Sequence, residues 1–362
     1  MNQRLVAACI AVPAIIGLLL VALFNRLPYA TYSPGGTVDV LGSDSNDAEV
    51  IQVDGHQVYR DDGQLRMTTV RVSPAQLPDE RGIGLVSLLG TWFDPDNAVY
   101  PYGAVHEEGE TQQSNQQQGA VQMATSQDAA VEVALEEMGI EVPQVLKVAA
   151  LTEGLPAQGK LQVGDVLLTI NGQTFTDQDA LVKLINDAPQ GKPVEVGIER
   201  QGTKQTISIT PVVDDAGVQR IGITPGFDFD FPFEVKINIS PEIGGPSAGL
   251  IFSLAVYDTL TPGSLTGGRA IAGTGEIRPD GSVGPIGGIQ QKIAGARGDG
   301  AELFLVPIDN CDDALQADNG DMRLMMAQDM HDVRLALEDY AADPDADLPS
   351  CEDADAILAE AS

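Results

Sequence analysis

Twenty uncharged, apolar residues run from Leu5 to Phe24, directly after the N-terminal residues MNQR. A helix needs about 20 such residues to cross the hydrocarbon core of a bilayer. A cleaved signal peptide usually has a shorter apolar region followed by an A-x-A-like site, whereas NRLPYATYSPGG follows here. We therefore predict an uncleaved transmembrane anchor at residues 5–24, within an N-terminal region of residues 1–28.

The charges on either side of this segment bear on its orientation. Arg4 and Arg26 flank it and nearly balance, so the positive-inside rule alone does not decide the topology. The very short N-terminal tail favours a single-pass anchor with everything after Phe24 on the extracytoplasmic side. The expected location is therefore the cell membrane.

The charge of the chain limits its partners. The formal net charge is −33 over 362 residues, which repels nucleic acid phosphates and anionic lipid headgroups. The same excess of acid also keeps a protein soluble in a salty medium. Nucleic acid is therefore excluded as an expected partner.

The cysteines and histidines are few. Cys9 lies inside the apolar run, and Cys311 and Cys351 remain as a pair that would close into a disulfide in an oxidising compartment. Two buried free thiols are the alternative. The three histidines are scattered at positions 56, 106 and 331, so no metal site is expected.

Residues 29–140 predict a β-rich segment that ends in a helix. Alternating apolar and polar residues around glycine turns indicate hairpins up to about residue 78. The glutamine-rich tract EEGETQQSNQQQG, residues 107–119, predicts a mobile loop. Thr125 and Asp128 form a capping-box pattern at the start of a predicted helix that Gly139 ends. No motif in this segment indicates a function.

Residues 141–214 have the pattern of a small compact domain. A strand, a glycine turn, a second strand, a helix and a closing hairpin follow one another. The runs Gly164-Asp165-Val166-Leu167 and Ile170-Asn171-Gly172, after Gly159 to Leu161, resemble a PDZ domain of the circularly permuted kind found in bacterial proteases. The resemblance implies that an extended peptide C-terminus adds as a strand to a sheet edge, or that the fold serves only as a spacer. By that resemblance the edge comprises Gln144, Val145, Leu146, Lys147 and Val148.

Nucleotide binding is excluded at the one P-loop-like run. Residues 154–160 fit G-x-x-x-x-G-K, but Leu161 stands where serine or threonine would hold Mg²⁺. Neither ATP nor another cofactor is therefore expected.

The run GGPSAGL places Ser247 in a G-x-S-x-G pattern before an apolar, helix-like stretch. Free N–H groups at a helix start can stabilise an oxyanion, but a helix-capping serine fits the pattern equally well. An α/β-hydrolase needs a histidine downstream, and only His331 follows, on a predicted surface helix. The other candidate base is Lys292, beside the apolar face of a short helix. A lysine desolvated there would act as a neutral general base, whereas a lysine reaching solvent would not.

Several further motifs occur in order: LTGG at 265–268, GTGEI at 273–277 and GSVGPIGGI at 281–289, followed by Lys292. Together with GPSAG, residues 245–249, they resemble the proteolytic domain of Lon-type serine peptidases. With the anchor and the PDZ-like segment, nearly the whole chain resembles the membrane-anchored, PDZ-containing Lon-like proteases of bacteria, notably actinobacteria. The implied fold class is α/β (α+β), with a Lon-type domain at 215–345 and a C-terminal tail at 346–362.

The resemblance implies roles for individual residues. Ser247 is the expected nucleophile, Lys292 its general base and Thr274 a hydrogen-bonding support for the lysine. The backbone N–H groups of Ser247 and Ala248 are the expected oxyanion hole. Many ATP-dependent relatives have an acidic residue three positions before the serine, where this chain has Gly244.

The chain carries no AAA+ motor motif, so the expected activity is ATP-independent cleavage of unfolded or flexible polypeptides, recruited through their C-termini. The resemblance also implies a homo-oligomeric ring, commonly a hexamer. The alternatives are a catalytically silent peptide-binding module and, with less support, an α/β-hydrolase.

Overall fold

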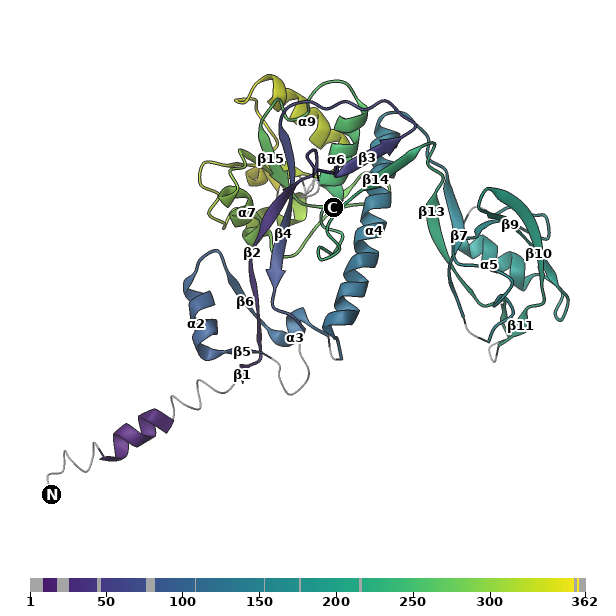
Figure 1. The fold of residues 1–362 in the computed structure, drawn as a ribbon, viewed down its shortest axis with the longest axis horizontal. Coiled ribbons are helices and arrows are strands. Elements are labelled where there is room, and N and C mark those ends of the chain that lie inside the picture. The colour runs from purple at the N-terminus through teal and green to yellow at the C-terminus, as the bar shows by residue number, and fades with distance from the viewer. Residues whose placement is uncertain are drawn as a thin grey trace. The chain divides into compact units, whose positions relative to one another are not determined.

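The computed structural model of the chain describes residues 9–17, 26–43, 47–75, 82–107, 109–152, 154–175, 177–214, 217–354 and 357. It has two compact units, one made of residues 1–140 with 233–362 and the other of residues 141–232 (Figure 1). The first unit carries Ser247 and Lys292 and is called the peptidase unit below. The second carries the PDZ-like segment and is called the PDZ unit.

The peptidase unit is built on a six-stranded sheet in the order β19-β18-β15-β4-β2-β6. Its strands are β2 (Tyr29–Asp39), β4 (Gln64–Val72), β6 (Ala98–Pro101), β15 (Ala270–Gly273), β18 (Leu303–Pro307) and β19 (Arg323–Ala327). β4 runs parallel to β15, with Leu65 opposite Ile271, while β2 is antiparallel to both β4 and β6. The predicted β-rich N-terminal segment is thus no separate domain, because its strands extend the sheet of the C-terminal part.

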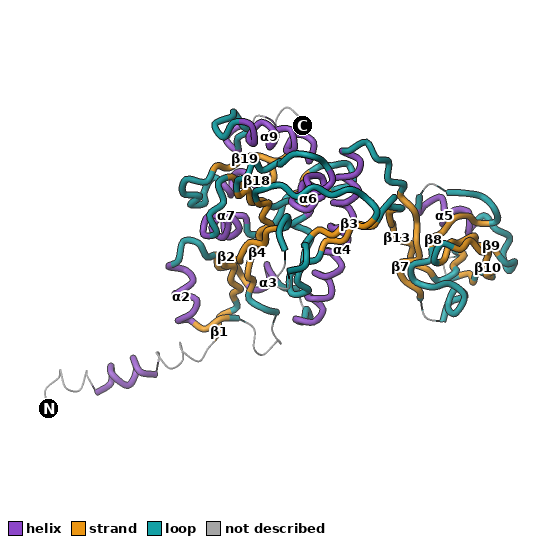
Figure 2. Tube along the Cα trace, turned by 45° about the horizontal axis from the view of Figure 1, so that its top comes forward, coloured by secondary structure: helices purple, strands orange, loops and turns teal. Residues whose placement is uncertain are grey.

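Helices cover both faces of this sheet. α6 (Gly249–Leu260) and α7 (Ile289–Gly298) lie on opposite sides of the central strands (Figures 1 and 2). Two neighbouring residues of β15 explain why the helices lie on opposite faces, since successive side chains of a strand point to opposite faces of the sheet. Ala272 packs in one core cluster with Ile293 of α7, whereas a Cβ at Gly273 would meet Ile251 of α6. The two helices can therefore approach each other only beyond an end of β15.

The glutamine-rich tract is helical from Gln112 onward, so its prediction as a mobile loop was wrong over that part. α4 (Gln112–Glu137) begins at the N-cap Thr111, which forms a capping box with Ser114. The pattern at Thr125 and Asp128 lies inside this helix and does not mark its start. Glutamine is a good helix former, and α4 packs along α6, so tertiary contact stabilises a stretch that has few apolar residues.

The N-terminal side of the unit has a short two-stranded sheet. β1 (Arg26–Leu27) pairs antiparallel with β5 (Ile83–Gly84), which leads directly into α2 (Leu85–Phe93) and then, after β6, into α3 (Tyr102–Val105). β3 (Ile51–Asp54) pairs with β14 (Glu234–Ile237), and β16 (Glu276–Ile277) with β17 (Val283–Gly284).

The predicted anchor at residues 5–24 falls largely outside the described residues, of which only 9–17 belong to it, and these are helical. Among the described residues, no helix combines the length and the apolar character that a membrane span requires.

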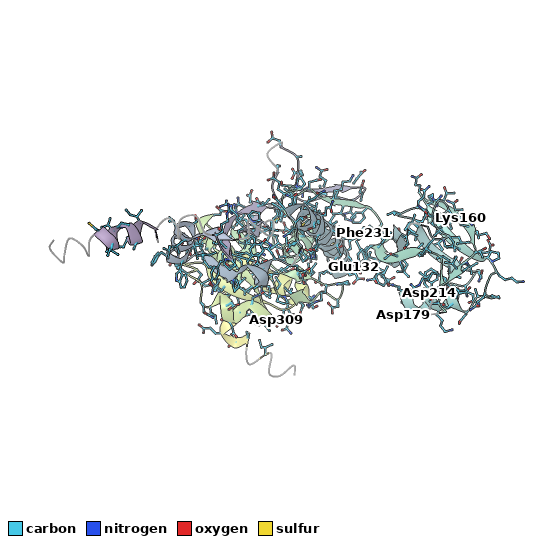
Figure 3. The ribbon with its side chains drawn as sticks, turned by 90° about the horizontal axis from the view of Figure 1, so that it is seen from below. Glu132, Lys160, Asp179, Asp214, Phe231 and Asp309 are labelled. Atoms are coloured by element: carbon cyan, nitrogen blue, oxygen red, sulfur yellow. A yellow bond between two sulfur atoms is a disulfide. The ribbon has the colours of Figure 1, made fainter. Side chains whose placement is uncertain are left out.

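The C-terminal region is tied to the peptidase unit. α9 (Met330–Ala342) follows β19, and a disulfide joins Cys311, at the start of α8 (Cys311–Ala314), to Cys351 in the 3-10 helix η3 (Cys351–Asp353). Both sulfurs lie in a buried apolar cluster with residues of α7 and β18. Asp309, labelled in Figure 3, belongs to the 3-10 turn η2 (Ile308–Asn310) just before α8. The predicted tail at 346–362 is thus packed at least through residue 354.

The PDZ unit has a five-stranded sheet in the order β10-β9-β8-β7-β13 and the helix α5 (Gln178–Asn186). Its strands are β7 (Gln144–Leu151), β8 (Val166–Ile170), β9 (Val194–Arg200), β10 (Thr203–Ile209) and β13 (Ile223–Phe229), with the small pair β11 (Val212–Val213) and β12 (Gln219–Arg220). Lys160, labelled in Figure 3, holds a loop of this unit to β10 by donating to the carbonyl of Ser208 at 2.9 Å.

The predicted peptide-binding edge, Gln144 to Val148, is a central strand. β7 pairs with β8 on one side and with β13 on the other, where Phe227 stands opposite Leu146. The Lys147 ammonium also contacts the Asp228 carboxylate of β13 at 2.7 Å. The prediction was wrong because residues 215–232 were assigned to the next domain, although they return to close this sheet. The free edge on that side is β13.

Candidate active site

The serine lies just before α6, where the chain turns sharply into the helix. The N-cap is Ala248, and it makes no side-chain capping hydrogen bond. Ser247 therefore does not cap the helix, and its hydroxyl is directed elsewhere. The carbonyl of Ser247 accepts from the N–H of Gly275 at 2.8 Å and from Oγ1 of Thr274 at 2.9 Å. These bonds fix the serine backbone to the segment that follows β15.

The structure brings Ser247, Lys292 and Thr274 together. Nζ of Lys292 lies 2.7 Å from Oγ of Ser247 and 2.8 Å from Oγ1 of Thr274. The three residues come from the start of α6, the second turn of α7 and the end of β15. Because β15 stops at Gly273, helices from opposite faces of the sheet meet beyond its carboxyl end, with Thr274 between them.

Lys292 is almost completely buried, with 2% of its surface exposed. Burial penalises the charged ammonium and lowers the pKa of Lys292 to about 7 from the ordinary 10.5. Burial is the cause of this lowered pKa, and among the described residues no neighbouring carboxylate offsets it by stabilising the ammonium. The amine is thus neutral in a large fraction of molecules near neutral pH, and it lies within reach of the serine proton.

Backbone donors lie beside the serine hydroxyl. The N–H of Leu250 already donates to the Gly275 carbonyl at 3.1 Å, and that of Gly249 makes a longer bond of 3.3 Å to Pro246. Within the described part of the chain, no hydrogen bond takes the N–H groups of Ser247 and Ala248. They stand at the N-terminal end of α6, where the helix dipole also favours a negative charge.

A cavity of about 520 Å³ opens beside Ser247 and Lys292. One wall is β4, from which six consecutive residues, Met67 to Val72, line the space. Glu242, Ile243 and Gly244, which precede the serine, also line it. β4 pairs with β15 only as far as Met67, whereas its other edge stays paired with β2 as far as Val72. The cavity is thus bordered by a strand edge that no described strand covers.

The structure gives a steric reason for Gly244. A Cβ at Gly244 would lie 2.9 Å from Cα of Gly119 on α4 and 3.0 Å from its carbonyl carbon. The N–H of Gly245 donates to the carbonyl of Gly119 at 2.9 Å. α4 therefore crosses in direct backbone contact with the serine loop, and the acidic side chain that many ATP-dependent relatives carry at this position has no room here.

Two positioning residues in α4 were missed by the sequence analysis. Ser126 donates from Oγ to the carbonyl of Pro246 at 2.9 Å, one residue before the nucleophile candidate. Gly119 makes the close approach described above. The only sequence signal was Gly119, which lies within a glutamine-rich tract. Because the tract was interpreted as a loop, the packing role of this glycine was not recognised.

His331, the other candidate base, lies away from this cluster. It is on α9, largely exposed, and its Nδ1 contacts the Glu137 carboxylate of α4 at 2.8 Å. No histidine is among the residues that line the cavity next to Ser247. The geometry therefore does not support a Ser-His-Asp arrangement.

The PDZ unit has a cavity of its own, of about 280 Å³, between α5 and the start of β13. Its apolar walls include Leu181, Val182 and Ile185 from α5 and Ile223 from β13. The loop before β13 has Gly222 at a positive φ of 90°, and a Cβ there would overlap Leu155. An apolar groove thus lies beside the free strand edge that replaces the predicted one.

Two known families match parts of this chain. Residues 121–210 match the PDZ domain family, and residues 238–337 match the Lon protease (S16) C-terminal proteolytic domain. The chain joins a PDZ domain to a Lon-type proteolytic domain. The resemblance inferred from the motifs is thereby confirmed, and the Lon-type match includes Ser247, Thr274 and Lys292.

Individual relatives are similar over limited regions. The Lon protease of Escherichia coli K12 is 32% identical over 124 residues, which are 33% of this chain and 15% of that protein. Lon protease 1 of Bacillus subtilis is 35% identical over 96 residues, 25% of this chain and 12% of the relative. A probable periplasmic serine endoprotease, DegP-like, of Pseudomonas savastanoi is 37% identical over 76 residues, 21% of this chain and 16% of the relative.

Among solved structures, the PDZ domain of an SdrC-like protein from Listeria innocua is 27% identical, with a TM-score of 0.21. The match covers 22% of this chain and 92% of that one. The chain spans only a small part of the length of the curated Lon proteases it matches.

Proposed function

We propose that the protein is a serine endopeptidase in which Ser247 is the nucleophile and Lys292 the general base. The observation that carries the proposal is the 2.7 Å approach of a buried lysine amine to the serine hydroxyl. A serine hydroxyl is a weak nucleophile until a neighbouring base accepts its proton. A lysine whose pKa is lowered to about 7 can accept that proton near neutral pH.

The reaction follows from the positions of these groups. Neutral Nζ of Lys292 takes the proton as Oγ of Ser247 attacks the scissile carbonyl carbon. The resulting oxyanion accepts hydrogen bonds from the N–H groups of Ser247 and Ala248. The lysine ammonium then gives its proton to the leaving amine, and an acyl-enzyme remains. Water, deprotonated by the same lysine, hydrolyses the ester and restores the serine.

Thr274 orients the base. Its hydroxyl accepts from Lys292 and donates to the carbonyl of Ser247, so one side chain holds the amine and the serine backbone in register. A lysine side chain otherwise has several rotatable bonds and no fixed direction. Holding the reacting atoms in place is worth a large part of the rate enhancement in enzymes generally.

The substrate is an extended polypeptide. The open edge of β4 along Thr68 to Val72 borders the cavity, and a peptide segment can add to it as a further strand. Such backbone pairing recognises chain conformation and only weakly recognises sequence. A folded protein does not offer a free strand, so the preferred substrates are unfolded or flexible chains.

The same proposal includes the energy requirement, the location, the substrate recruitment and the assembly of the protein. Cleavage is independent of ATP, the apolar segment at 5–24 anchors the chain in the membrane, and the catalytic part is extracytoplasmic. The Cys311–Cys351 disulfide supports an oxidising compartment. The PDZ domain recruits substrate C-termini at β13 and α5, and copies of the chain assemble into a ring.

The test is cleavage of casein and of a fluorogenic peptide by the full chain in detergent micelles. Ser247→Ala and Lys292→Ala are expected to lose activity, whereas Lys236→Ala is the matched control. Lys236 is an exposed lysine of the same unit, paired with Glu234 at 2.7 Å. Equal activity in all four proteins would rule out the dyad. No activity in the wild type under any condition would favour a silent peptide-binding module.

The pH profile tests the state of the base. Only the neutral amine accepts a proton, so kcat/KM is expected to rise with pH through an apparent pKa of about 7. A flat profile between pH 5 and 9 would contradict a titrating lysine base.

A further inference from the structure

Helix α2 exposes an apolar face with no cover among the described residues. Four of its side chains are largely in solvent: Val86 at 64%, Leu89 at 44%, Trp92 at 71% and Phe93 at 82% exposure. They recur at helical spacings of three and four residues, so they share one side of the helix. Leu88 alone is buried and holds α2 to the unit. The helix sequence LVSLLGTWF has no charged residue.

The position of α2 in the fold indicates what covers this face. α2 begins directly after β5, and β5 pairs with β1, where Arg26 stands opposite Gly84. β1 in turn begins two residues after Phe24, the end of the apolar run. α2, β5 and β1 lie together at one end of the peptidase unit (Figure 1). The pairing therefore fixes α2 within a few residues of the segment for which a membrane anchor is proposed.

We propose that α2 is an interfacial helix that rests on the membrane, with Trp92, Phe93, Leu89 and Val86 inserted at the level of the lipid headgroups. This proposal rests on the membrane attachment proposed above. The inserted helix turns a single-pass tether into a two-point attachment. It thereby holds the peptidase unit in one orientation on the bilayer.

The side chains suit a zwitterionic lipid interface. Tryptophan and other amphipathic aromatic residues concentrate at the boundary between headgroups and acyl chains, and short apolar helix faces bind there by burying area. The net charge of −33 disfavours anionic lipid, and α2 offers no lysine or arginine to attract it. Binding should therefore depend on apolar insertion and be nearly insensitive to salt.

Tryptophan fluorescence reports on this face directly, because Trp92 is the only tryptophan in the chain. The full chain is reconstituted into phosphatidylcholine vesicles, with or without lipid brominated near the headgroup end of the acyl chains. Brominated lipid is expected to reduce Trp92 emission about twofold or more, while acrylamide in the water quenches it weakly. The matched control is Trp92→Phe with Val163→Trp, which moves the tryptophan to an exposed position of the PDZ domain. Its emission should respond to acrylamide and not to bromine.

A second variant, Leu89→Ser with Phe93→Ser, removes half of the apolar face and keeps the reporter. It should restore acrylamide quenching and weaken bromine quenching, while cleavage of a short peptide stays unchanged.

Each other outcome overturns the proposal in a recognisable way. If the chain floats with the vesicles but only acrylamide quenches Trp92, the attachment stands and the interfacial helix is wrong. If Trp92 is shielded from both quenchers, the face is covered by protein, such as a second copy. If the chain does not float, membrane attachment fails together with this proposal, and peptide cleavage, measured on the same samples, shows whether the peptidase assignment survives.

Discussion

The candidate active site of the Lon-type domain and the apolar groove of the PDZ domain are formed by different kinds of interaction. In the first, the buried amine of Lys292 lies 2.7–2.8 Å from the hydroxyls of Ser247 and Thr274, and each of the three residues belongs to a short glycine-rich motif. In the second, an apolar groove lies between a helix and a strand edge, with no buried ionisable group in its lining.

The difference shows which kind of site can be found from sequence. Ser247 and Lys292 lie in local motifs, and the resemblance of these motifs to Lon-type peptidases was enough to predict that the two residues lie together. The PDZ groove depends on which strand closes the sheet. That pairing is long-range, and no residue of β7 indicates it. The comparison is therefore tested by variants that change either the contacts at Ser247 and Lys292 or the groove beside β13, but not both.

The largest effect is expected from Lys292→Met. Lys292 is the one candidate base beside Ser247 among the residues that the structure describes, so removing it should lower kcat/KM by about 10³-fold or more, as for other nucleophile–base pairs. The folded protein should nevertheless become more stable, because methionine fills the same space without a buried amine. Peptide cleavage and thermal unfolding on the same samples measure both effects.

The stability gain should depend on pH. The pKa of Lys292 is about 7 in the folded state and about 10.5 when unfolded, so the unfolded state binds more protons between these values. The lysine therefore destabilises the wild type by a few kcal/mol at pH 7 and below, and this cost falls as pH rises toward 10.5. The Lys292→Met advantage should shrink over that range. An advantage that is constant with pH would contradict a desolvated lysine.

A smaller effect is expected from Thr274→Val, which keeps the shape of the side chain and removes the hydroxyl. The amine then loses one of its two hydroxyl contacts, and the Ser247 carbonyl loses a donor. We expect kcat to fall about 10- to 100-fold with little change in KM, since the loss is one of orientation. Thr274→Ser should restore most of the rate. A valine variant with full activity would show that burial alone orients the lysine.

The sequence predicted the two families and the contact of Ser247, Thr274 and Lys292, because each of these predictions depends on local motifs. It did not predict that residues 29–140 complete the peptidase sheet, since the parallel pairing of β4 with β15 joins segments about two hundred residues apart. Only the C-terminal half of helix α4 was predicted, for a similar reason. Its first turns are polar, and only packing against α6 and the serine loop explains why they are ordered.

The role of α4 is tested by Gly244→Ala. The added Cβ would meet the backbone of Gly119, so either the serine loop or the helix must move. Overpacking of this kind costs about 1–3 kcal/mol of unfolding free energy. A shift of the nucleophile should lower kcat about 10-fold. Gly298→Ala, at an exposed position with no atom near the added Cβ, is the matched control. If both variants behave alike, the close approach of α4 has no effect on the site.

The smallest effect on catalysis, and the sharpest test of the second region, is expected from Val182→Lys. Val182 is a half-exposed residue of α5 in the groove beside β13, so a lysine there obstructs the groove without entering the core. Binding of peptides with a free C-terminus should weaken about 10-fold, while cleavage of a short fluorogenic peptide stays unchanged. Val163→Lys, exposed on the same domain but outside the groove, should bind as the wild type does. If Val182→Lys binds normally and Lys147→Ala does not, peptides reach β7 after all, and β13 must leave the sheet edge to admit them.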